Sequence, residues 1–513
     1  MNQPNVGVPQ ERLLARRTVL EMGCGLVGLG VLAACTDPTH DHSVVGPTSA
    51  HGTATLAPAP EPTTGTWTVP VEPMTFPAGF VWGSATSAFQ VEGSTTADGR
   101  GVSIWDTFAA EPGRIDDGST ADPAADQYRR WEQDLDLMQD LGLQAYRFSV
   151  SWPRIVPAGS GEVNQKGVDH YRRLVDGLLD RGMHPAITLY HWDLPQPLQD
   201  RGGWTVRETA DRFAEYSAVM FEALRDVDAT WLTINEPKTT SMVGYAGTEH
   251  APALGDLDAG LASVHHQLLA HGKAVEAFRE IGGRGGIGIA LNLMPVYAAP
   301  GADLAAARLD SAENRLYLDP VLLGTYPDDA IGDAPGQLHG DRAAFDALVL
   351  DGDLETISRP CDVLAVQYYG VAGIDKTGAW LQLYPPSPAG WQQVHAEGLY
   401  ELLVRLPHDY PQLPPLVISE NGIPDPDAQG QLDDPQRVDF LRTHLQQAAR
   451  AMAEGVDLRQ YYAWSFLDNF EWARGMTQRW GIVHVDYGSQ RRTPKTSATW
   501  YSRVARENQV RPD

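Results

Sequence analysis

From Phe80 onward, short apolar segments rich in β-branched residues alternate with longer amphipathic segments. In Arg207–Asp226, apolar side chains recur every three or four residues, which is the pattern of a helix with one buried face. Leu261–Ile281 and Pro435–Glu454 repeat this period. The short apolar segments predict eight strands: Phe80–Thr86, Gln144–Trp152, Pro185–Trp192, Thr230–Glu236, Gly286–Leu293, Asp362–Tyr369, Leu416–Glu420 and Gln460–Leu467.

Strands that alternate with helices favour a parallel sheet, because each helix carries the chain back to the start of the next strand. Eight such units predict an α/β fold, a single (β/α)8 TIM barrel with long βα loops, over residues 72–508. The pattern predicts no second folded domain. In such a barrel, the side chains that carry out chemistry lie at the carboxyl ends of the strands.

The first 35 residues follow a different pattern. Arg16 and Arg17 directly precede a short, glycine-rich apolar segment that ends at Cys35. A twin-arginine pair in this position predicts a Tat-type signal peptide over residues 1–35, and the segment is short for a membrane-spanning helix. Leu32-Ala33-Ala34-Cys35 resembles a bacterial lipoprotein cleavage box, so we expect Cys35 to become an acylated first residue. A plain signal peptide with an incidental cysteine is the alternative. Either way, we expect Tat export to the cell surface or the extracellular medium.

Residues 36–71 are rich in Pro, Thr and Ala and contain few large apolar side chains. Such a segment buries too little apolar surface to fold, so we expect a disordered linker. Cys361 is then the only cysteine in the folded part, since Cys24 and Cys35 belong to the signal peptide. Without a disulfide framework, stability must come from a large buried core.

The formal net charge of the chain is −27. Nucleic acids and anionic membrane surfaces attract clustered Lys and Arg, so this balance argues against both as partners. We expect small molecules as partners, and contact with a membrane only through the lipid on Cys35.

Polar and aromatic side chains that are unusual in a barrel wall gather near the ends of most predicted strands. They are Gln90, Arg147, His191, Asp193, Asn235, Glu236, Tyr369, Glu420, Trp464, Glu471 and Trp472. Since the carboxyl ends of all eight strands share one rim of a barrel, we expect these side chains to converge on one site.

Four motifs that contain seven of these residues resemble glycoside hydrolase family 1, and the resemblance extends from about Phe76 to about Trp500. Phe80–Gly93 resembles the family's N-terminal signature. Thr233–Pro237 is similar to its acid/base motif, and Ile418–Gly422 to its nucleophile motif. Trp464–Trp472 resembles its sugar-binding loop.

The resemblance implies a retaining β-glycosidase, with a β-glucosidase expected first, that forms a covalent glycosyl-enzyme intermediate. Glu236 would be the catalytic acid/base and Glu420 the catalytic nucleophile. Arg147 and Tyr369 would orient Glu420 and favour its charged form. The resemblance places the following residues around the sugar: Gln90, His191, Asn235, Tyr369, Trp464, Glu471 and Trp472.

The pair Glu471-Trp472 is typical of family members that act on unphosphorylated sugars, so we expect glucose first and galactose or fucose next. Three positions depart from the family pattern, one of them Pro424 after Ile423, where a small residue is usual. Gln367 stands where Asn is usual, and Lys238 follows Asn-Glu-Pro where an aromatic or apolar residue is common.

We expect no cofactor and no metal. His265, His266 and His271 fall on one predicted helix without a metal-ligand pattern, so we interpret them as structural. A transglycosidase that uses the same intermediate is one alternative function. A non-catalytic, sugar-binding lipoprotein is another, although the presence of both Glu236 and Glu420 argues against it.

Overall fold

The computed structural model of the chain describes residues 73–427 and 429–511. The predicted signal peptide, with Cys35, and the predicted linker lie outside the described residues. Within the described ranges, no helix combines the length and apolar character that crossing a membrane requires.

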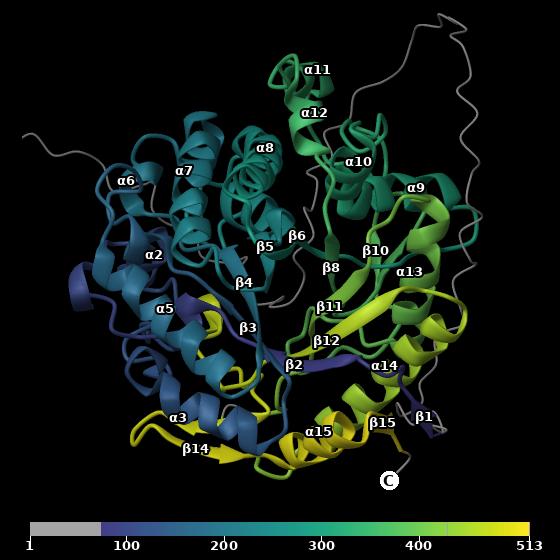
Figure 1. Ribbon diagram of the computed structural model, residues 1–513. Helices are drawn as coiled ribbons and strands as arrows, with labels where there is room; N and C mark the ends of the chain where they lie inside the picture. Colours follow the sequence, from purple (N-terminus) through teal and green to yellow (C-terminus); the bar gives the residue numbers. More distant parts are fainter. Residues whose placement is uncertain (1–72, 428, 512–513) are drawn as a thin grey trace, which may run out of the picture. The chain divides into compact units, whose positions relative to one another are not determined.

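Eight parallel strands form a closed barrel in the centre of the domain, which confirms the predicted (β/α)8 fold (Figure 1). Around the barrel, each strand is hydrogen-bonded to two neighbours, and β2 closes the ring by pairing with both β12 and β3. The barrel strands are β2 (Val81–Ala85), β3 (Ala145–Ser149), β4 (His184–Tyr190), β5 (Ala229–Asn235), β6 (Gly285–Asn292), β8 (Val363–Gln367), β11 (Leu416–Asn421) and β12 (Leu458–Trp464).

Two predicted strand ends were wrong by three residues. The strand predicted to reach Trp152 ends at Ser149, and the short helix α4 (Trp152–Ile155) follows it. Pro153 explains the break, because proline cannot donate to a strand ladder but fits the first turn of a helix. The last barrel strand ends at Trp464 rather than Leu467, since the Ser465 N–H turns away to donate to the Trp480 carbonyl at 3.0 Å.

The three predicted amphipathic helices are confirmed as α7 (Glu208–Ala223), α8 (Leu257–Ile281) and α14 (Pro435–Ala453). The other long helices are α3 (Gln127–Asp140), α5 (Gln165–Asp180), α13 (Ala396–Asp409) and α15 (Thr496–Glu507). Figure 1 shows these helices packed around the outside of the barrel. The longer βα loops add β7 (Val296–Ala298), β9 (Ala372–Ile374) and β10 (Trp380–Leu381), which form a small sheet, and a hairpin of β13 (Val483–Asp486) and β14 (Arg491–Pro494).

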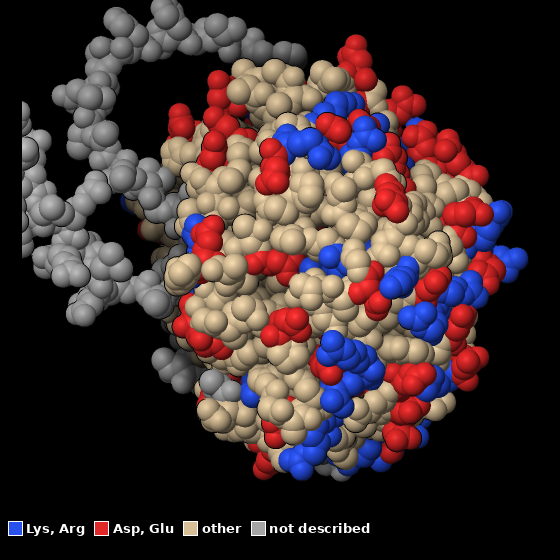
Figure 2. Space-filling view, turned by 90° about the vertical axis from the view of Figure 1, so that its left-hand side faces the viewer, with Lys and Arg blue, Asp and Glu red and all other residues tan. Residues whose placement is uncertain are grey.

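The inside of the barrel is filled by a buried cluster of small and aromatic side chains. Ala85, Ala145, Ala186 and Ala290 belong to one buried cluster with Trp464. Close packing of the wall leaves no room for a side chain at position 288, where a Cβ would lie 1.8 Å from the Val363 carbonyl oxygen. On the face shown in Figure 2, acidic and basic side chains are interspersed.

A charged contact outside the barrel joins the start of α7 to the helix α12 (Asp353–Ile357). Arg207 donates from Nη1 to Asp353 Oδ2 at 2.7 Å, and His265 Nε2 lies 3.0 Å from the same oxygen. Burial raises the pKa of Asp353, but hydrogen bonds from Arg207 and the Leu350 amide outweigh it and lower the pKa to about 2. The contact therefore stabilises the folded chain in the charged form of Asp353.

We expect Arg207→Met to lower the free energy of unfolding by about 1–2 kcal/mol near neutral pH, because Asp353 loses its charged donor in a partly screened position. The loss should vanish as the pH falls from about 4 to about 2, where Asp353 becomes protonated in both states. Chemical denaturation measures it. The exposed pair Arg459–Asp457 provides the control, since Arg459→Met should change stability by less than about 0.5 kcal/mol. Equal losses of stability in the two variants would contradict the conclusion that the Arg207–Asp353 contact stabilises the fold.

Candidate active site

Glu420, near the end of β11, is buried and accepts three hydrogen bonds. Arg147 Nη1, from β3, and Gln367 Nε2, from β8, donate to Oε1 at 2.5 and 2.7 Å. Tyr369 Oη donates to Oε2 at 2.7 Å. Burial raises the pKa of Glu420 above its ordinary value, and Arg147 and Tyr369 offset part of this rise. Because all three partners donate, one of them a cation, the contacts favour the carboxylate over the neutral acid.

Asn235 ends β5 and accepts hydrogen bonds from two of the same donors, Arg147 and Gln367. Its Oδ1 accepts from Arg147 Nη2 at 2.5 Å and from Gln367 Nε2 at 2.6 Å. The amide group must therefore present its Nδ2 as the donor, and this atom lies 3.1 Å from His191 Nε2. Burial, followed by the charge of Arg147, lowers the pKa of His191 well below its ordinary value, so the ring is neutral.

Glu236 directly follows Asn235 and has a different environment from Glu420. Its backbone has φ +45°, an uncommon value for a residue with a side chain, and its amide donates to the Ala290 carbonyl at 2.9 Å. Thr239 Oγ1 donates to Glu236 Oε2 at 2.5 Å. Burial raises the pKa of Glu236 to about 7, and the neighbouring charge of Glu420 adds to the effect. Below that pH the side chain is a neutral acid with a proton to give.

A third carboxyl group, that of the partly buried Glu471, lies opposite Gln90. Gln90 Nε2 donates to Glu471 Oε2 at 3.2 Å and to Asn469 Oδ1 at 3.0 Å. Burial and then the charge of Glu420 raise the pKa of Glu471 to about 8. Glu471 and Asn469 belong to the same loop after β12, so Gln90 connects the first barrel strand's loop to the last one's.

Aromatic rings complete the site. The His191 ring is nearly parallel to the rings of Trp464 and Trp472, with centroids 6.0 and 5.9 Å away. Trp472 has φ +50° and also stacks on Phe89 at 6.0 Å. Flat, buried rings of this kind suit the apolar C–H faces of a sugar.

The structure brings the predicted site residues together through direct contacts. Arg147 joins Asn235 to Glu420, His191 joins Asn235 to the two tryptophans, and Gln90 reaches Glu471. This geometry fits the predicted arrangement, while the chemical role of each residue stays a prediction.

Two residues at the site were not predicted from the sequence, and the contacts of a third were underestimated. Thr239 and Asn469 were absent from the predicted set, although both lie within motifs that had been singled out or directly beside them. Gln367 was noted only as a departure, yet it contacts both Glu420 and Asn235. The longer side chain therefore still reaches Glu420, and its buried Oε1 has no hydrogen-bond partner among the described residues.

Lys238, another departure, forms an ion pair with Glu313, with Nζ 3.1 Å from Oε2. Lys238 directly precedes the π-helical turn η3 (Thr239–Tyr245), and Glu313 lies within a second such turn, η4 (Ser311–Arg315). Such turns are frequent at functional sites.

Across residues 73–427 and 429–511, no group of three or more His, Cys, Asp or Glu side chains is arranged to hold a metal ion. The three histidines of α8 have protein partners instead. His265 lies against Asp353, His266 against the Trp204 carbonyl, and His271 against Thr233.

Sequence comparison shows that this chain is similar to known proteins over most of its length. The sequence model of a family described as glycosyl hydrolase family 1 matches residues 72–510. β-Glucosidase A of Acetivibrio thermocellus is 45% identical over 451 residues, covering 85% of this chain and 99% of that protein. A bifunctional β-D-glucosidase/β-D-fucosidase of Bifidobacterium breve is 41% identical and covers 85% of this chain and 100% of its own length.

Solved structures agree with the sequence comparison. The β-glucosidase of Thermotoga maritima in complex with deoxynojirimycin has a TM-score of 0.79 and 40% identity, covering 85% of this chain and 99% of that one. A psychrophilic β-glucosidase of Micrococcus antarcticus has the same TM-score, 43% identity, and coverage of 85% and 98%.

The site geometry predicts that Glu236 titrates near pH 7 and that Glu420 raises its pKa. In a Glu420→Gln variant the repulsion is gone, so we expect the pKa of Glu236 to fall toward its ordinary value while burial keeps it above that value. Carbon-13 NMR of labelled glutamate measures both titrations, and Glu236→Gln identifies the signal. An unchanged pKa in the Glu420→Gln variant would show that the two carboxyl groups do not interact.

Proposed function

The chain belongs to glycosyl hydrolase family 1, and from this membership we propose that it is a β-glucosidase that removes terminal β-D-glucosyl residues from small β-glucosides and oligosaccharides. Its named relatives, at 41–45% identity, are β-glucosidases, one of them also a β-fucosidase. β-Fucosides and β-galactosides are the expected secondary substrates.

The proposed reaction has two steps. Glu420 attacks the anomeric carbon while Glu236 donates its proton to the glycosidic oxygen, so the C–O bond breaks, the alcohol leaves, and a covalent glycosyl-enzyme remains. Esterification removes the charge of Glu420, which lowers the pKa of Glu236. Glu236 then takes a proton from water, and the oxygen attacks the anomeric carbon, which releases the sugar with retained configuration.

One observation carries this assignment of roles: the hydrogen-bond donors to the two glutamates differ in number and in charge. Glu420 accepts from Arg147, Gln367 and Tyr369, which suits a charged nucleophile. Glu236 accepts from the neutral hydroxyl of Thr239, and its pKa of about 7 suits a proton donor.

In the proposed complex, Asn235 donates from Nδ2 to the 2-hydroxyl of the sugar, because its Oδ1 already accepts from Arg147 and Gln367. Gln90 and Glu471 bind the hydroxyls on the far side of the ring, with Trp472 beside them and Trp464 as the stacking floor. Glu471 offers an acceptor and no cation, which favours a free hydroxyl over a phosphate.

Beyond the glycosidic bond, the leaving group meets Lys238 and Glu313 on one side. Trp391, 46% exposed, stacks on Trp480 at 6.3 Å and lies edge-on to Tyr369 at 5.7 Å. An ion pair and an exposed ring together suit a polar leaving group with an apolar face, such as a second sugar.

We expect Glu420→Ala to lose at least about 10³-fold in kcat on a nitrophenyl β-glucoside, because no group remains to form the covalent intermediate. Added azide should restore turnover by attacking from the vacated side, giving a glycosyl azide of inverted configuration. Product NMR identifies it. Glu236→Ala is the matched control, since azide should there give the retained product and the loss should be larger for poor leaving groups. An inverted product from the Glu236 variant would mean that Glu236 is the nucleophile and Glu420 the acid/base.

The same assay on the wild-type protein tests the rival functions. Turnover of the β-glucoside above that of the 6-phosphoglucoside supports the proposal. Sugar binding without turnover of any glycoside would identify a binding protein, and transfer products that exceed hydrolysis at low acceptor concentration would identify a transglycosidase.

We also propose that the enzyme is exported through Tat and tethered to the cell surface by a lipid on Cys35. The supporting features are Arg16-Arg17 before the apolar segment and the Leu-Ala-Ala-Cys sequence that ends it. Export in a folded state suits a domain whose stability does not depend on forming disulfides outside the cell.

We expect Cys35→Ala to move the enzyme from the membrane fraction to the soluble fraction, because the lipid would be its membrane attachment. Fractionation with a nitrophenyl glucoside assay measures the distribution, and Cys361→Ala is the control that should leave it unchanged. Retention of the Cys35 variant in the membrane fraction would contradict lipid anchoring, and export of an Arg16→Lys, Arg17→Lys double variant would contradict the Tat route.

A further inference from the structure

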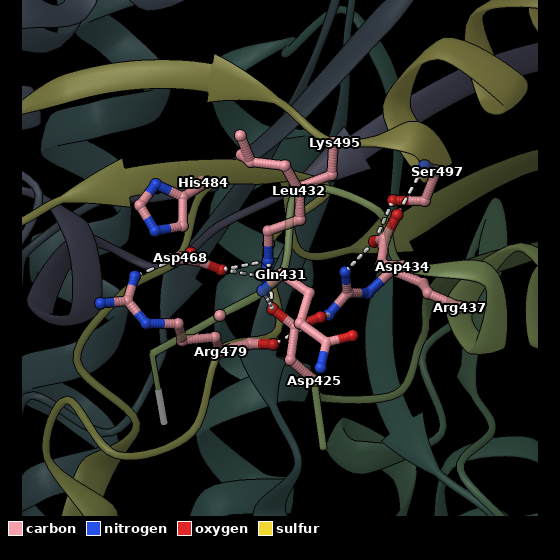
Figure 3. Close-up of polar contacts among 12 residues, drawn as sticks. Asp425, Gln431, Leu432, Asp434, Arg437, Asp468, Arg479, His484, Lys495 and Ser497 are labelled. Carbon is pink, nitrogen blue, oxygen red and sulfur yellow. Dashed lines mark hydrogen bonds and ion pairs between the residues drawn. The ribbon is translucent and has the colours of Figure 1, made fainter. Parts of the chain in front are cut away.

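A second cluster of buried charges lies outside the site described above, between the two loops that carry Glu420 and Glu471. Figure 3 shows its contacts. Three carboxylates and three cations make it up, so its formal charge is balanced: Asp425, Asp434, Asp468, Arg437, Arg479 and Lys495.

Lys495 lies at the centre of this cluster. It precedes α15 and is fully buried, and its Nζ donates to Asp425 Oδ2 at 2.7 Å and to Asp468 Oδ1 at 2.9 Å. Asp425 follows the nucleophile by five positions, and Asp468 precedes Glu471 by three. A single ammonium group therefore joins the loop after β11 to the loop after β12.

On the nucleophile side, Arg437 from α14 holds the loop backbone. Its Nε donates to the Ile423 carbonyl at 3.1 Å, its Nη2 to Asp425 Oδ1 at 2.5 Å, and its Nη1 contacts Asp434. Asp434 in turn accepts from the Ser497 amide at 2.8 Å. The three residues after Gly422 are thereby fixed to two outer helices.

On the sugar-binding side, Asp468 is surrounded by donors. Arg479 Nη1 donates to its Oδ2 at 2.9 Å, and the Gly481 amide donates to Oδ1 at 3.1 Å. Burial raises the pKa of Asp468, but Lys495 and Arg479 outweigh it and hold the pKa below its ordinary value. The next residue is Asn469, which accepts the hydrogen bond from Gln90.

Burying six charges is a costly way to stabilise a fold, because desolvation offsets much of the attraction. Buried networks of this kind do fix geometry, since each charge is held only where its partners are. Without Lys495, Asp425 and Asp468 would face each other as like charges, and the two loops would separate or shift.

We propose that Lys495, through Asp425 and Asp468, is a positioning residue that fixes Glu471 and Trp472 relative to Glu420. It thereby sets how well the enzyme distinguishes the 4-hydroxyl configuration of the sugar. The inference rests on the proposed β-glucosidase function and goes beyond it, since none of the three residues reaches the sugar.

The test compares kcat/KM for nitrophenyl β-glucoside and nitrophenyl β-galactoside, which differ only at the 4-hydroxyl. In Lys495→Met, we expect the ratio of the two values to fall about tenfold toward unity, a change of about 1.4 kcal/mol in discrimination. Glu471→Gln, which alters the direct contact, should lower the ratio as well. Asp468→Asn is the second variant, because it keeps the shape of the side chain, removes its charge and replaces one acceptor oxygen by a donor.

Arg207→Met is the matched control. This substitution also removes a cation from a carboxylate. The lost contact, however, joins α7 to α12, away from both loops. We expect the substitution to lower stability and leave the glucoside-to-galactoside ratio unchanged. Measuring at a temperature where every variant is folded by circular dichroism separates selectivity from loss of protein.

An unchanged ratio in both Lys495→Met and Asp468→Asn would overturn the inference, and so would an equal change in Arg207→Met. Absence of glucoside hydrolysis by the wild-type enzyme would instead contradict the proposed function itself. The two failures are therefore distinguishable in one set of assays.

Discussion

The site depends on one buried guanidinium group, that of Arg147. It donates to Glu420 at 2.5 Å and to Asn235 at 2.5 Å, and its Nε donates to Thr188 Oγ1 at 3.1 Å. The planar fork of arginine can hold all three partners in fixed directions, which a lysine could not do. Because these contacts join β3 to β4, β5 and β11, the closed barrel fixes the orientation of Glu420. Fold and chemistry therefore share a single constraint.

Three carboxyl groups lie within electrostatic reach of one another, and Glu420 accepts a hydrogen bond from the cationic Arg147. This asymmetry separates their proton affinities. Glu236, with a pKa of about 7, and Glu471, with a pKa of about 8, share the repulsion of Glu420 without its cationic partner. A substrate hydroxyl that donates to Glu471 would favour its charged form. Because the charges of Glu236, Glu420 and Glu471 interact, the ionisation of Glu471 is coupled to the protonation of Glu236.

Much of this arrangement was readable from the sequence. Alternating strands and helices predict the barrel, and the rule that chemistry lies at strand ends brings Glu236 and Glu420 to one rim. Contacts that form only when the chain folds could not be predicted from the sequence. Thr239 becomes a donor only because η3 turns it back onto Glu236, and Pro153 ends a strand that hydrophobicity alone extends to Trp152. Lys495 resembles an ordinary charged residue near the C-terminus until the fold buries it between two loops.

The central claim, that Glu420 is the nucleophile held by Arg147, is tested most directly by trapping the intermediate. A 2-deoxy-2-fluoroglucosyl fluoride supplies a good leaving group and slows the hydrolysis of the covalent product, so the glycosyl-enzyme should accumulate. Mass spectrometry of the digested protein should then show one added fluorosugar on the peptide that contains Glu420, and little labelling in an Arg147→Met variant under the same conditions. A label on the peptide that contains Glu236, or no covalent label while the wild-type enzyme turns over glucosides, would contradict the account.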